Sequence, residues 1–594
     1  MAEPIPEEKF TLLVVMEGEN PYRKAFLINV PPQYKFGQVE DIIQEVYYRK
    51  RQISIYDLEL YRGNVPREQV ANIQLSDEAF LLADQQIASE WPSKSDVREG
   101  LVHIIVRAKY THRTTTPPSP ETEFDQFIAS FKSAQLTFVQ SASKLTSSSA
   151  AQPRKFRAQQ TGPDYINIGR PAQKSWLPIV LYHPVFGRFL RRLRSNDPID
   201  PDIYAYTRDH FIVSQELYEE DITRSNSKAT SRDKVTRESL HRLLGDALQK
   251  IRVNGVEADG VITGPDASCL VIMEMKNEIG LGSSDPSIQA AESYMRYWSD
   301  DLVARWRDWC CCPSILIGIA GPWMCILGGI FLDRPAVQPL TDFVWVGDDP
   351  ARPSGLDYVA RMFDSLSQAR NELDEYYEHN QPPSSGEDTG RPFPYLTRYT
   401  DSTGQVVKFA YRKALCPGNP EKAIFLAETD KDSKRIIVKF VQNYNAHAHE
   451  LLAEKGLAPQ LLYDGTKYPE EQPGPEHTMI VMEFIQGENY ELFSKHSRLP
   501  RSAFDDIKAA VDLLHSHDYV FGDLRPPNVM VLQDSNGKPT GKAMLIDFDW
   551  CGKHGEGRYP LRMNLTLGFH SDVRYGDVMY KQHDIHMIKK LDAR

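Results

Sequence analysis

The stretch VFGDLRPPNVMVL (520–532), followed by MLIDFDW (544–550), decides how the last third of this 594-residue chain is interpreted. Asp523 and Asn528 lie five positions apart between apolar runs, and Asp547 ends the next apolar run nineteen positions later. Apolar runs of this length predict strands, so the three polar side chains are expected at strand ends and in the loop between them. Because Mg²⁺ or Mn²⁺ accepts carboxylate and amide oxygens, the pattern predicts a site for a metal-bound phosphate.

Other segments of the C-terminal part fit a nucleotide site. RIIVKFV places Lys439 on a strand, TMIVMEFIQG places Glu483 at a strand end, and NAHAHELLAEKG places Glu450 on a helix. In this order, residues 390–594 resemble the protein-kinase-like superfamily. The resemblance implies bound Mg-ATP with the following roles: Lys439 at the phosphates, Glu450 as the helix glutamate, Glu483 near the adenine, Asn528 and Asp547 on the metal, and Asp523 as acceptor of the hydroxyl proton.

Three departures from the kinase pattern leave alternatives open. A GxGxxG motif is missing, and only Gly418 stands where a phosphate loop belongs. Glu450 and Glu454 share one face of the expected helix, but His447 also fits the place of the helix glutamate. An APE segment is missing after Asp547. The alternatives are a kinase that phosphorylates a protein and a pseudokinase that acts as a scaffold.

A second set of charged residues lies in the middle of the chain. In the apolar run CLVIMEMK, Glu274 and Lys276 share one face of the expected strand, whereas Met273 and Met275 face the other side. Asp259 begins the preceding strand, where it can meet Glu274 across the ladder. Two carboxylates and a strand carbonyl suit Mg²⁺ or Mn²⁺, and a lysine beside the metal can orient or deprotonate a water. The other interpretation is an exposed edge strand that carries a surface Glu–Lys pair.

This D…ExK pattern resembles the PD-(D/E)XK nuclease superfamily, which implies a restriction-endonuclease-like α/β core that hydrolyses DNA. The resemblance also suggests accessory roles for Gln289 and Tyr294 on the helix DPSIQAAESYMRYW. The preceding helix, expected over Arg237 to Ile251, offers Glu238 as an added acidic ligand. The basic segment FGRFLRRLRSN either contacts DNA phosphates or forms a solvated helix face, and its candidate side chains are Arg188, Arg191, Arg192 and Arg194.

The first part of the chain predicts a small β-grasp, ubiquitin-like domain. Its phrases LLVVMEGE, AFLINV, QVEDIIQEV, DLELYRGNVP and GLVHIIVRA resemble, in that order, the N-terminal domain of the Crinkler family of fungal and oomycete proteins. The resemblance implies an effector or toxin that acts inside cells, with the nucleus as its location and a host protein as a partner of this domain. The expected elements are strands Phe10–Met16, Lys24–Val30, Leu58–Arg62 and Val102–Arg107, and a helix Val39–Tyr48.

Composition and patterning narrow these expectations. A net charge of −12 excludes a protein that coats nucleic acid by its bulk charge, although a regional basic face is compatible with DNA binding. The uncharged run Ser314 to Leu332 is divided by Gly321-Pro322, which predicts two buried strands and no membrane span. Seven cysteines without a CxxC pair indicate reduced, buried thiols in an intracellular compartment, and no secretory signal is recognised.

The predicted fold is therefore α+β and multidomain: a ubiquitin-like domain (1–110), a linker (111–162) with one helix near Phe124 to Val139, a nuclease-like part (163–385) and a kinase-like part (390–594). The preferred function is metal-dependent cleavage of DNA by the middle part, with an ATP-binding C-terminal part as a second activity or a regulator. The alternatives are a protein kinase whose middle part binds DNA without cutting it, and a non-enzymatic scaffold. A homodimer is compatible with each account.

Overall fold

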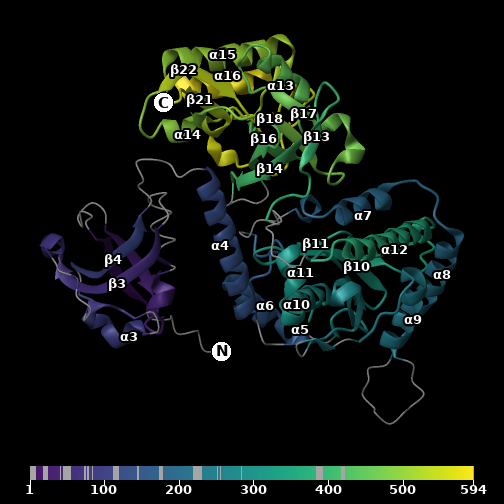
Figure 1. The fold of residues 1–594 in the computed structure, drawn as a ribbon. Coiled ribbons are helices and arrows are strands. Elements are labelled where there is room, and N and C mark those ends of the chain that lie inside the picture. The colour runs from purple at the N-terminus through teal and green to yellow at the C-terminus, as the bar shows by residue number, and fades with distance from the viewer. Residues whose placement is uncertain are drawn as a thin grey trace. The chain divides into compact units, whose positions relative to one another are not determined.

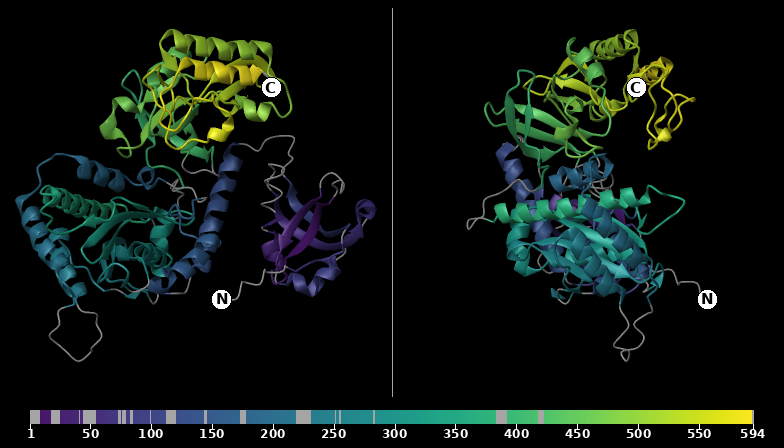
Figure 2. Two further views of the ribbon diagram at one scale, coloured as in Figure 1. Left: turned by 180° about the vertical axis from the view of Figure 1, so that it is seen from behind. Right: turned by 90° about the vertical axis from the view of Figure 1, so that its right-hand side faces the viewer.

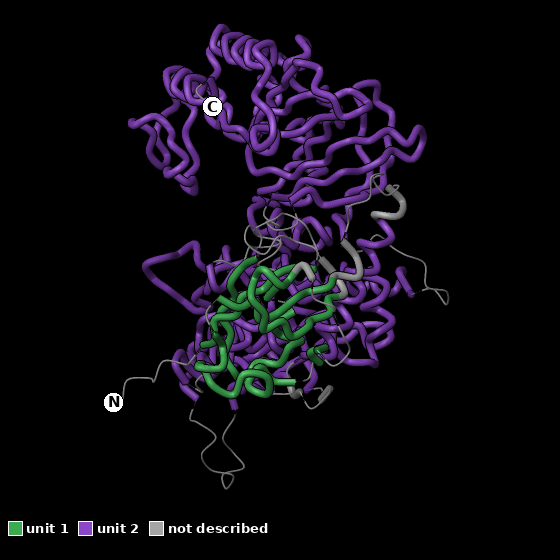
Figure 3. Tube along the Cα trace, turned by 90° about the vertical axis from the view of Figure 1, so that its left-hand side faces the viewer, with its two compact units in different colours: residues 1–119 green, residues 120–594 purple. Residues whose placement is uncertain are grey.

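The protein is a mixed α+β multidomain chain with several sheets, and it divides into two compact units, residues 1–119 and 120–594 (Figure 3). The computed structural model describes residues 9–592 except 18–24, 41, 44–54, 73–74, 76–78, 83–84, 99, 112–119, 143–145, 173–177, 219–230, 251, 254–255, 282–283, 383–391 and 417–421. Within these residues, no helix combines the length and the apolar character needed to cross a membrane.

The first unit is a sheet in the order β2-β1-β4-β3, in which β1 runs parallel to β4 and the other neighbours are antiparallel. Leu12 and Val14 pack in one apolar cluster, and Leu13 and Val15 pack in another, because successive side chains of β1 face opposite sides. The four strands predicted for this part are present. Most of the predicted helix Val39–Tyr48 lies outside the described residues. The elements are β1 Phe10–Met16, β2 Phe26–Val30, β3 Ile55–Pro66, η1 Arg67–Asn72, α3 Ile87–Glu90, η3 Lys94–Asp96 and β4 Leu101–Thr111.

The second unit begins with helices where the sequence predicted a linker. The predicted helix near Phe124 to Val139 is confirmed and is longer than expected. It is packed against the rest of the unit: Gln135 Nε2 donates over 2.6 Å to the carbonyl of Leu332, and Phe138 is buried against Phe331. Most of the stretch predicted as a linker (111–162) that the structure describes is therefore helical, and Ile128, Phe138 and Phe156 are buried in the unit. The elements are α4 Pro120–Ser141, α5 Ser147–Ala150 and α6 Pro153–Thr161.

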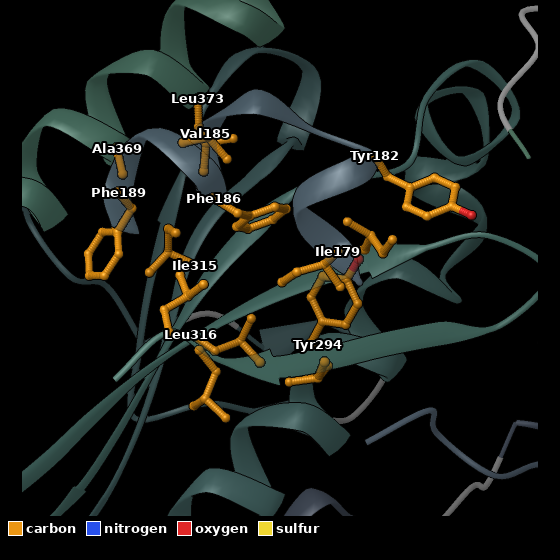
Figure 4. Packing of buried hydrophobic residues seen from close by; sticks show 14 of the residues in the cluster. Ile179, Tyr182, Val185, Phe186, Phe189, Tyr294, Ile315, Leu316, Ala369 and Leu373 are labelled. Carbon is orange, nitrogen blue, oxygen red and sulfur yellow. The ribbon is translucent and has the colours of Figure 1, made fainter. Parts of the chain in front are cut away.

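The central region of the second unit is built on a sheet in the order β11-β10-β9-β8-β7, with β12 added on β10. β8 and β9 are parallel, and β9 and β10 form the predicted pair of buried strands, joined at Gly321 with φ +58°. Gly328 of β10 touches Phe186 of α7, whereas Gly329 touches Tyr294 of α10. Neighbouring strand residues face opposite sides, so α7 and α10 cover opposite faces of the sheet. α12 packs on α7 (Figures 1 and 4).

Both boundaries of the helix predicted over Arg237 to Ile251 differ in the structure. α9 begins after Ser231, whose hydroxyl accepts from the N–H of Lys234, and it ends at Leu244 because Gly245 adopts φ +72°. The elements of this region are η4 Ile179–Leu181, α7 Pro184–Arg194, α8 Pro201–Gln215, α9 Arg232–Leu244, β5 Arg252–Val253, β6 Val256–Glu257, β7 Gly260–Thr263, η5 Pro265–Ala267, β8 Cys269–Lys276, α10 Pro286–Trp298, η7 Asp301–Val303, α11 Ala304–Trp309, β9 Ser314–Ala320, β10 Trp323–Phe331, β11 Pro335–Pro339, β12 Val344–Trp345 and α12 Gly355–His379.

The C-terminal region contains a sheet in the order β13-β14-β15-β16-β18-β17, a smaller sheet β19-β21-β22 and a helical part (Figures 1 and 2). One apolar cluster runs from the central sheet into this sheet and includes Phe393, Tyr411 and Phe425. The two regions therefore share one core. The elements are β13 Arg398–Thr400, β14 Val406–Ala414, β15 Ile424–Thr429, β16 Arg435–Val441, α13 Ala446–Ala453, β17 Leu461–Asp464, η8 Gly465–Lys467, η9 Pro469–Glu471, β18 Thr478–Glu483, β19 Gly487–Asn489, α14 Tyr490–Phe493, α15 Arg501–Ser516, β20 Tyr519–Val520, η10 Pro526–Asn528, β21 Val529–Gln533, β22 Pro539–Leu545, β23 Gly552–Lys553, η11 Leu565–Leu567 and α16 Lys581–Asp592.

Candidate functional site

The central site is built on the hairpin of β7 and β8. Asp259 directly precedes β7, and its Oδ2 accepts a hydrogen bond of 2.8 Å from the backbone N–H of Met275. Glu274 lies one position earlier on β8, and its side chain is fully buried. The ladder pairs Gly260 with Met273, so both carboxyl groups lie at the same end of the hairpin. The structure thus brings together the two acidic residues that the sequence singled out.

Helix α10 supports the carboxylate of Glu274. Gln289 Nε2 and Ser293 Oγ both donate to it, the latter over 2.5 Å. The two donors are four residues apart and therefore share one face of the helix. Tyr294 lies elsewhere, because its hydroxyl donates over 2.8 Å to the carbonyl of Cys312 and its ring is buried in the core. The structure therefore places Gln289 and the unpredicted Ser293 at the site, and it removes Tyr294 from it.

The two carboxyl groups are poorly solvated and repel each other. Burial raises the pKa of Asp259, although the hydrogen bond from Met275 opposes the change. Burial, and after it the charge of Asp259, raise the pKa of Glu274 to about 8. The charge of Lys276, which is half-buried at the end of β8, opposes both changes. Among the described residues, no ion pair joins this lysine to either carboxylate.

The acidic residue of α9 whose charge reaches this site is Asp233, which the sequence pattern did not single out. Its charge acts on Asp259, and its carboxylate binds Lys250 at 2.8 Å and Arg237 at 2.9 Å. The predicted accessory ligand Glu238 has a side chain that is 65% exposed and pairs with Lys234 on the same helix. Helix rotation explains the difference, because residues 233 and 237 share one face and 234 and 238 share another.

The arginines proposed as DNA contacts have partners inside the second unit. They lie on or at the end of α7, between α12 and the chain that connects η9 with β18. The side chains of Arg188 and Arg194 are nevertheless 50% and 52% exposed. The partners are Glu372 for Arg188 and Arg192, the carbonyl of Gln472 for Arg191 at 2.9 Å, and Glu476 for Arg194 at 2.5 Å.

The donor chemistry of the central site fits a hard divalent ion. Among the described residues, no group of three or more His, Cys, Asp or Glu side chains has a metal-site arrangement. Asp259 and Glu274 supply two carboxylates, and the remaining ligands would be a strand carbonyl and waters, which Mg²⁺ commonly keeps. Because both pKa values are raised by burial and repulsion, a divalent charge between the two groups would favour their ionised forms.

The C-terminal site is built around Lys439 of β16. Its Nζ donates over 2.6 Å to Asp547 and over 2.5 Å to Asp549, which the sequence pattern did not single out. Burial lowers the pKa of Lys439, but the two aspartates outweigh it and raise the pKa overall. Burial raises the pKa of Asp547, but Lys439 outweighs it and lowers the pKa overall. Burial and the charge of Asp547 raise the pKa of Asp549 to about 7.

The loop that contains Asp523 is held by hydrogen bonds of its own. Asp523 is buried, and both of its carboxylate oxygens accept from Arg525. The amide nitrogen of Asn528 donates to the carbonyl and to the carboxylate of Asp523, over 2.9 and 2.8 Å. The amide oxygen of Asn528 is therefore the atom suited to a metal. The structure brings Asp523 and Asn528 together, and it adds Arg525 to the loop.

Asp584 of α16 fixes the start of this loop. It is buried, and it accepts from the backbone N–H groups of Phe521 at 2.8 Å and Gly522 at 3.0 Å. His515 also faces its carboxylate, at 3.0 Å. Asp584 was not predicted from the sequence, because nothing in the local pattern of α16 distinguishes it from an exposed helix aspartate.

Two residues predicted to bind the nucleotide have other partners. Glu450 pairs with Lys467 at 3.3 Å, and the ion pairs of Lys439 among the described residues are with Asp547 and Asp549 instead. The carboxylate of Glu483 accepts from the backbone N–H of Gln460 over 2.8 Å. Gly418, the predicted phosphate-loop glycine, lies outside the described residues.

Comparisons with known proteins add little to this geometry. No family model matches the chain, and no curated protein does. Among solved structures, the chain is similar to the kinase PK-1 of Cydia pomonella granulovirus, with 13% identity and a TM-score of 0.20. The match covers 28% of this chain and 61% of the viral kinase, so it spans less than two thirds of that protein. Such a TM-score supports no conclusion about fold or function.

Proposed function

We propose that the central region hydrolyses phosphodiester bonds of DNA with Mg²⁺ or Mn²⁺. The observation that carries the proposal is the pair of carboxyl groups of the buried Glu274 and the half-buried Asp259, which lie at the same end of the hairpin and close enough for the charge of Asp259 to act on Glu274. Burying two acidic groups costs several kcal/mol unless a cation compensates them. Acidic groups that are buried at this cost in free energy are expected where they take part in catalysis or binding. A shifted pKa is likewise typical of functional sites.

Each residue of the central site has a role in this proposal. Asp259 and Glu274 would hold the ion, which would supply the charge that stabilises the phosphate in the transition state. Gln289 and Ser293 orient Glu274 through their hydrogen bonds. Lys276 would orient the attacking water and, as the neutral amine, accept its proton. These roles are the ones that the resemblance to the PD-(D/E)XK superfamily implies.

A plasmid-nicking assay on the full-length protein tests this proposal. Cleavage is expected with Mg²⁺ or Mn²⁺, is expected to stop with EDTA, and is expected to fall at least 100-fold in Glu274→Gln and Lys276→Met. The matched control is Glu238→Gln, a change on an exposed helix face that is expected to leave cleavage unchanged. Cleavage by Glu274→Gln at the wild-type rate would remove the carboxylate pair from the chemistry.

A second candidate function, phosphoryl transfer by the C-terminal region, is favoured by the arrangement of Lys439, Asp523, Asn528 and Asp547. Two acidic groups, an amide and a buried lysine are the parts that position Mg-ATP and an acceptor hydroxyl. Transfer of labelled phosphate to a protein or to the chain itself is expected, and Asp523→Asn is expected to abolish it. If neither cleavage nor transfer is detected, the scaffold alternative is favoured.

The assignment of the N-terminal part to a ubiquitin-like domain is part of the same proposal. The sheet β2-β1-β4-β3 with its parallel central pair supports a ubiquitin-like N-terminal domain, in line with the Crinkler resemblance. We therefore propose an effector that acts in the nucleus and binds a host protein through residues 1–110. Microscopy of the tagged full-length chain tests the location, and exclusion from the nucleus would argue against DNA as the target.

A further inference from the structure

Lys439 is a buried cation that depends on nearby carboxylates. The residue is 6% exposed, and its ammonium group binds both Asp547 and Asp549. A buried ammonium without a counter-charge is strongly destabilising. In the proposed function, Asp547 is the residue that takes the metal of Mg-ATP. Lys439 then needs another carboxylate to hold it while it reaches the phosphates.

Helix α13, all of whose residues are described, does not supply this carboxylate. The α13 side chain that faces the core near Lys439 is His449, whose ring stacks on Phe548 with centroids 4.6 Å apart. Its Nδ1 lies 2.8 Å from the hydroxyl of Tyr444, and burial lowers its pKa to about 4, so the ring is neutral. Glu450, the next residue, is turned about 100° around the helix and has a side chain that is 45% exposed.

Asp549 is placed where the missing carboxylate is needed. It lies two positions after Asp547, and both side chains reach the same Nζ atom from one segment of chain. The backbone of Asp547 has φ +73°, which turns the chain between the end of β22 and Asp549. Two carboxyl groups face one ammonium group, which can balance the charge of only one of them. One carboxylate can therefore turn to a metal while the other stays.

We propose that Asp549 is the positioning residue that keeps Lys439 in place when Mg-ATP is bound, so that Asp547 is available to the metal. The inference rests on the proposed nucleotide binding by the C-terminal region. It assigns to the segment after β22 a role that kinase-like sites otherwise give to a helix glutamate. It also explains why Glu450 can pair with Lys467 without loss of the site.

Calorimetric titration of the full-length protein with ATP at fixed Mg²⁺ tests the inference. Asp549→Asn and Lys439→Met are each expected to weaken ATP binding by about 10- to 100-fold. The double variant is expected to bind ATP as weakly as Lys439→Met and no more weakly, because Asp549 acts only through Lys439. Glu450→Gln is expected to bind like the wild type. The matched control, Asp512→Asn, changes an exposed aspartate of α15 and is also expected to have no effect.

The outcomes separate the inference from the function on which it rests. If the wild type binds ATP and Asp549→Asn binds it with the same affinity, the role of Asp549 is overturned and the nucleotide site is retained. The same conclusion follows if the losses of the two single variants add in the double variant. A loss in Glu450→Gln would do the same and return the role to α13. Full recovery of Asp549→Asn at high Mg²⁺ would make Asp549 a metal ligand instead. No ATP binding by the wild type would overturn the nucleotide site and the inference together.

Discussion

Replacing Glu292 by glutamine is expected to stabilise the second unit above neutral pH. Glu292 lies on α10, the helix that orients Glu274, and its side chain is fully buried. Neither of its carboxylate oxygens has a hydrogen-bond partner of ordinary geometry among the described residues. Burial raises its pKa to about 7, and the charge of Arg296, one turn further along α10, and the nearby side chain of Gln159 oppose the change only in part.

The sign and size of the effect follow from linkage between proton binding and folding. In the unfolded chain Glu292 ionises near pH 4.5, whereas in the folded protein it keeps its proton up to about pH 7. Below pH 4.5 both states are protonated, and the group has no net effect by this route. Stability falls as the pH rises from 4.5 to 7 and then levels off, about 3 kcal/mol lower. Glutamine cannot ionise, and after allowance for burial of its amide we expect a gain of about 2 kcal/mol at pH 8.

Hydrogen exchange of the peptide that spans α10, followed by mass spectrometry, measures this gain in the full-length protein. At pH 8, Glu292→Gln is expected to exchange about 30-fold more slowly than the wild type, and at pH 4.5 the two are expected to be nearly equal. Comparison at equal pH cancels the intrinsic pH dependence of exchange. The control Glu378→Gln alters an exposed side chain of α12 and is expected to show no trend. A wild-type-to-variant ratio that does not change with pH would contradict the assigned cause.

Three further predictions concern single residues of the second unit, two of them its stability and one its affinity for DNA. In urea unfolding, Gly187→Ala is expected to destabilise the unit by about 1–3 kcal/mol, because the new Cβ would lie 1.7 Å from the carbonyl oxygen of Pro473. The control Gly355→Ala has open space around the new Cβ and is expected to be neutral or stabilising. Asp584→Asn is expected to cost about 2 kcal/mol and to lower the melting temperature, because a buried acceptor of two backbone N–H groups loses its charge; an unchanged melting temperature would contradict this. In anisotropy titrations, Arg188→Ala is expected to leave the affinity for DNA and its salt dependence unchanged, because the Arg188 side chain binds an internal glutamate. If the slope of the logarithm of the binding constant against the logarithm of the salt concentration becomes smaller by about one, Arg188 contacts a phosphate.

The sequence predicted the strands of both sites because strand patterns are local. Glu274 and Lys276 were placed on one face by a period of two, and the hairpin brings Asp259 to the same end. The same logic predicted the pair β9 and β10, since Gly321-Pro322 is a turn signal between two apolar runs. These predictions needed no knowledge of how helices pack on the sheet.

Helix rotation and segment packing could not be predicted in the same way. Asp233 and Glu238 both lie on α9, and only the packing of that helix on α8 and α12 decides which one faces Asp259. On α13, a rotation by one residue places His449 in the core and Glu450 at the surface. The Ser, Thr, Pro and Gln content of residues 111–162 predicts a linker, but apolar side chains spaced along α4, such as Phe138, are buried against the central region.

The two candidate sites balance their buried acidic groups in different ways, and this decides what each can bind. In the central site, no cation among the described residues lies within ion-pair distance of Asp259 or Glu274, and burial raises the pKa values of both groups. A divalent ion bound between them would favour their ionised forms. In the C-terminal site, Lys439 already lies between two carboxylates, and a metal must compete with it. The phosphates of a nucleotide would give the ammonium group a new partner, so metal and nucleotide are expected to bind there together.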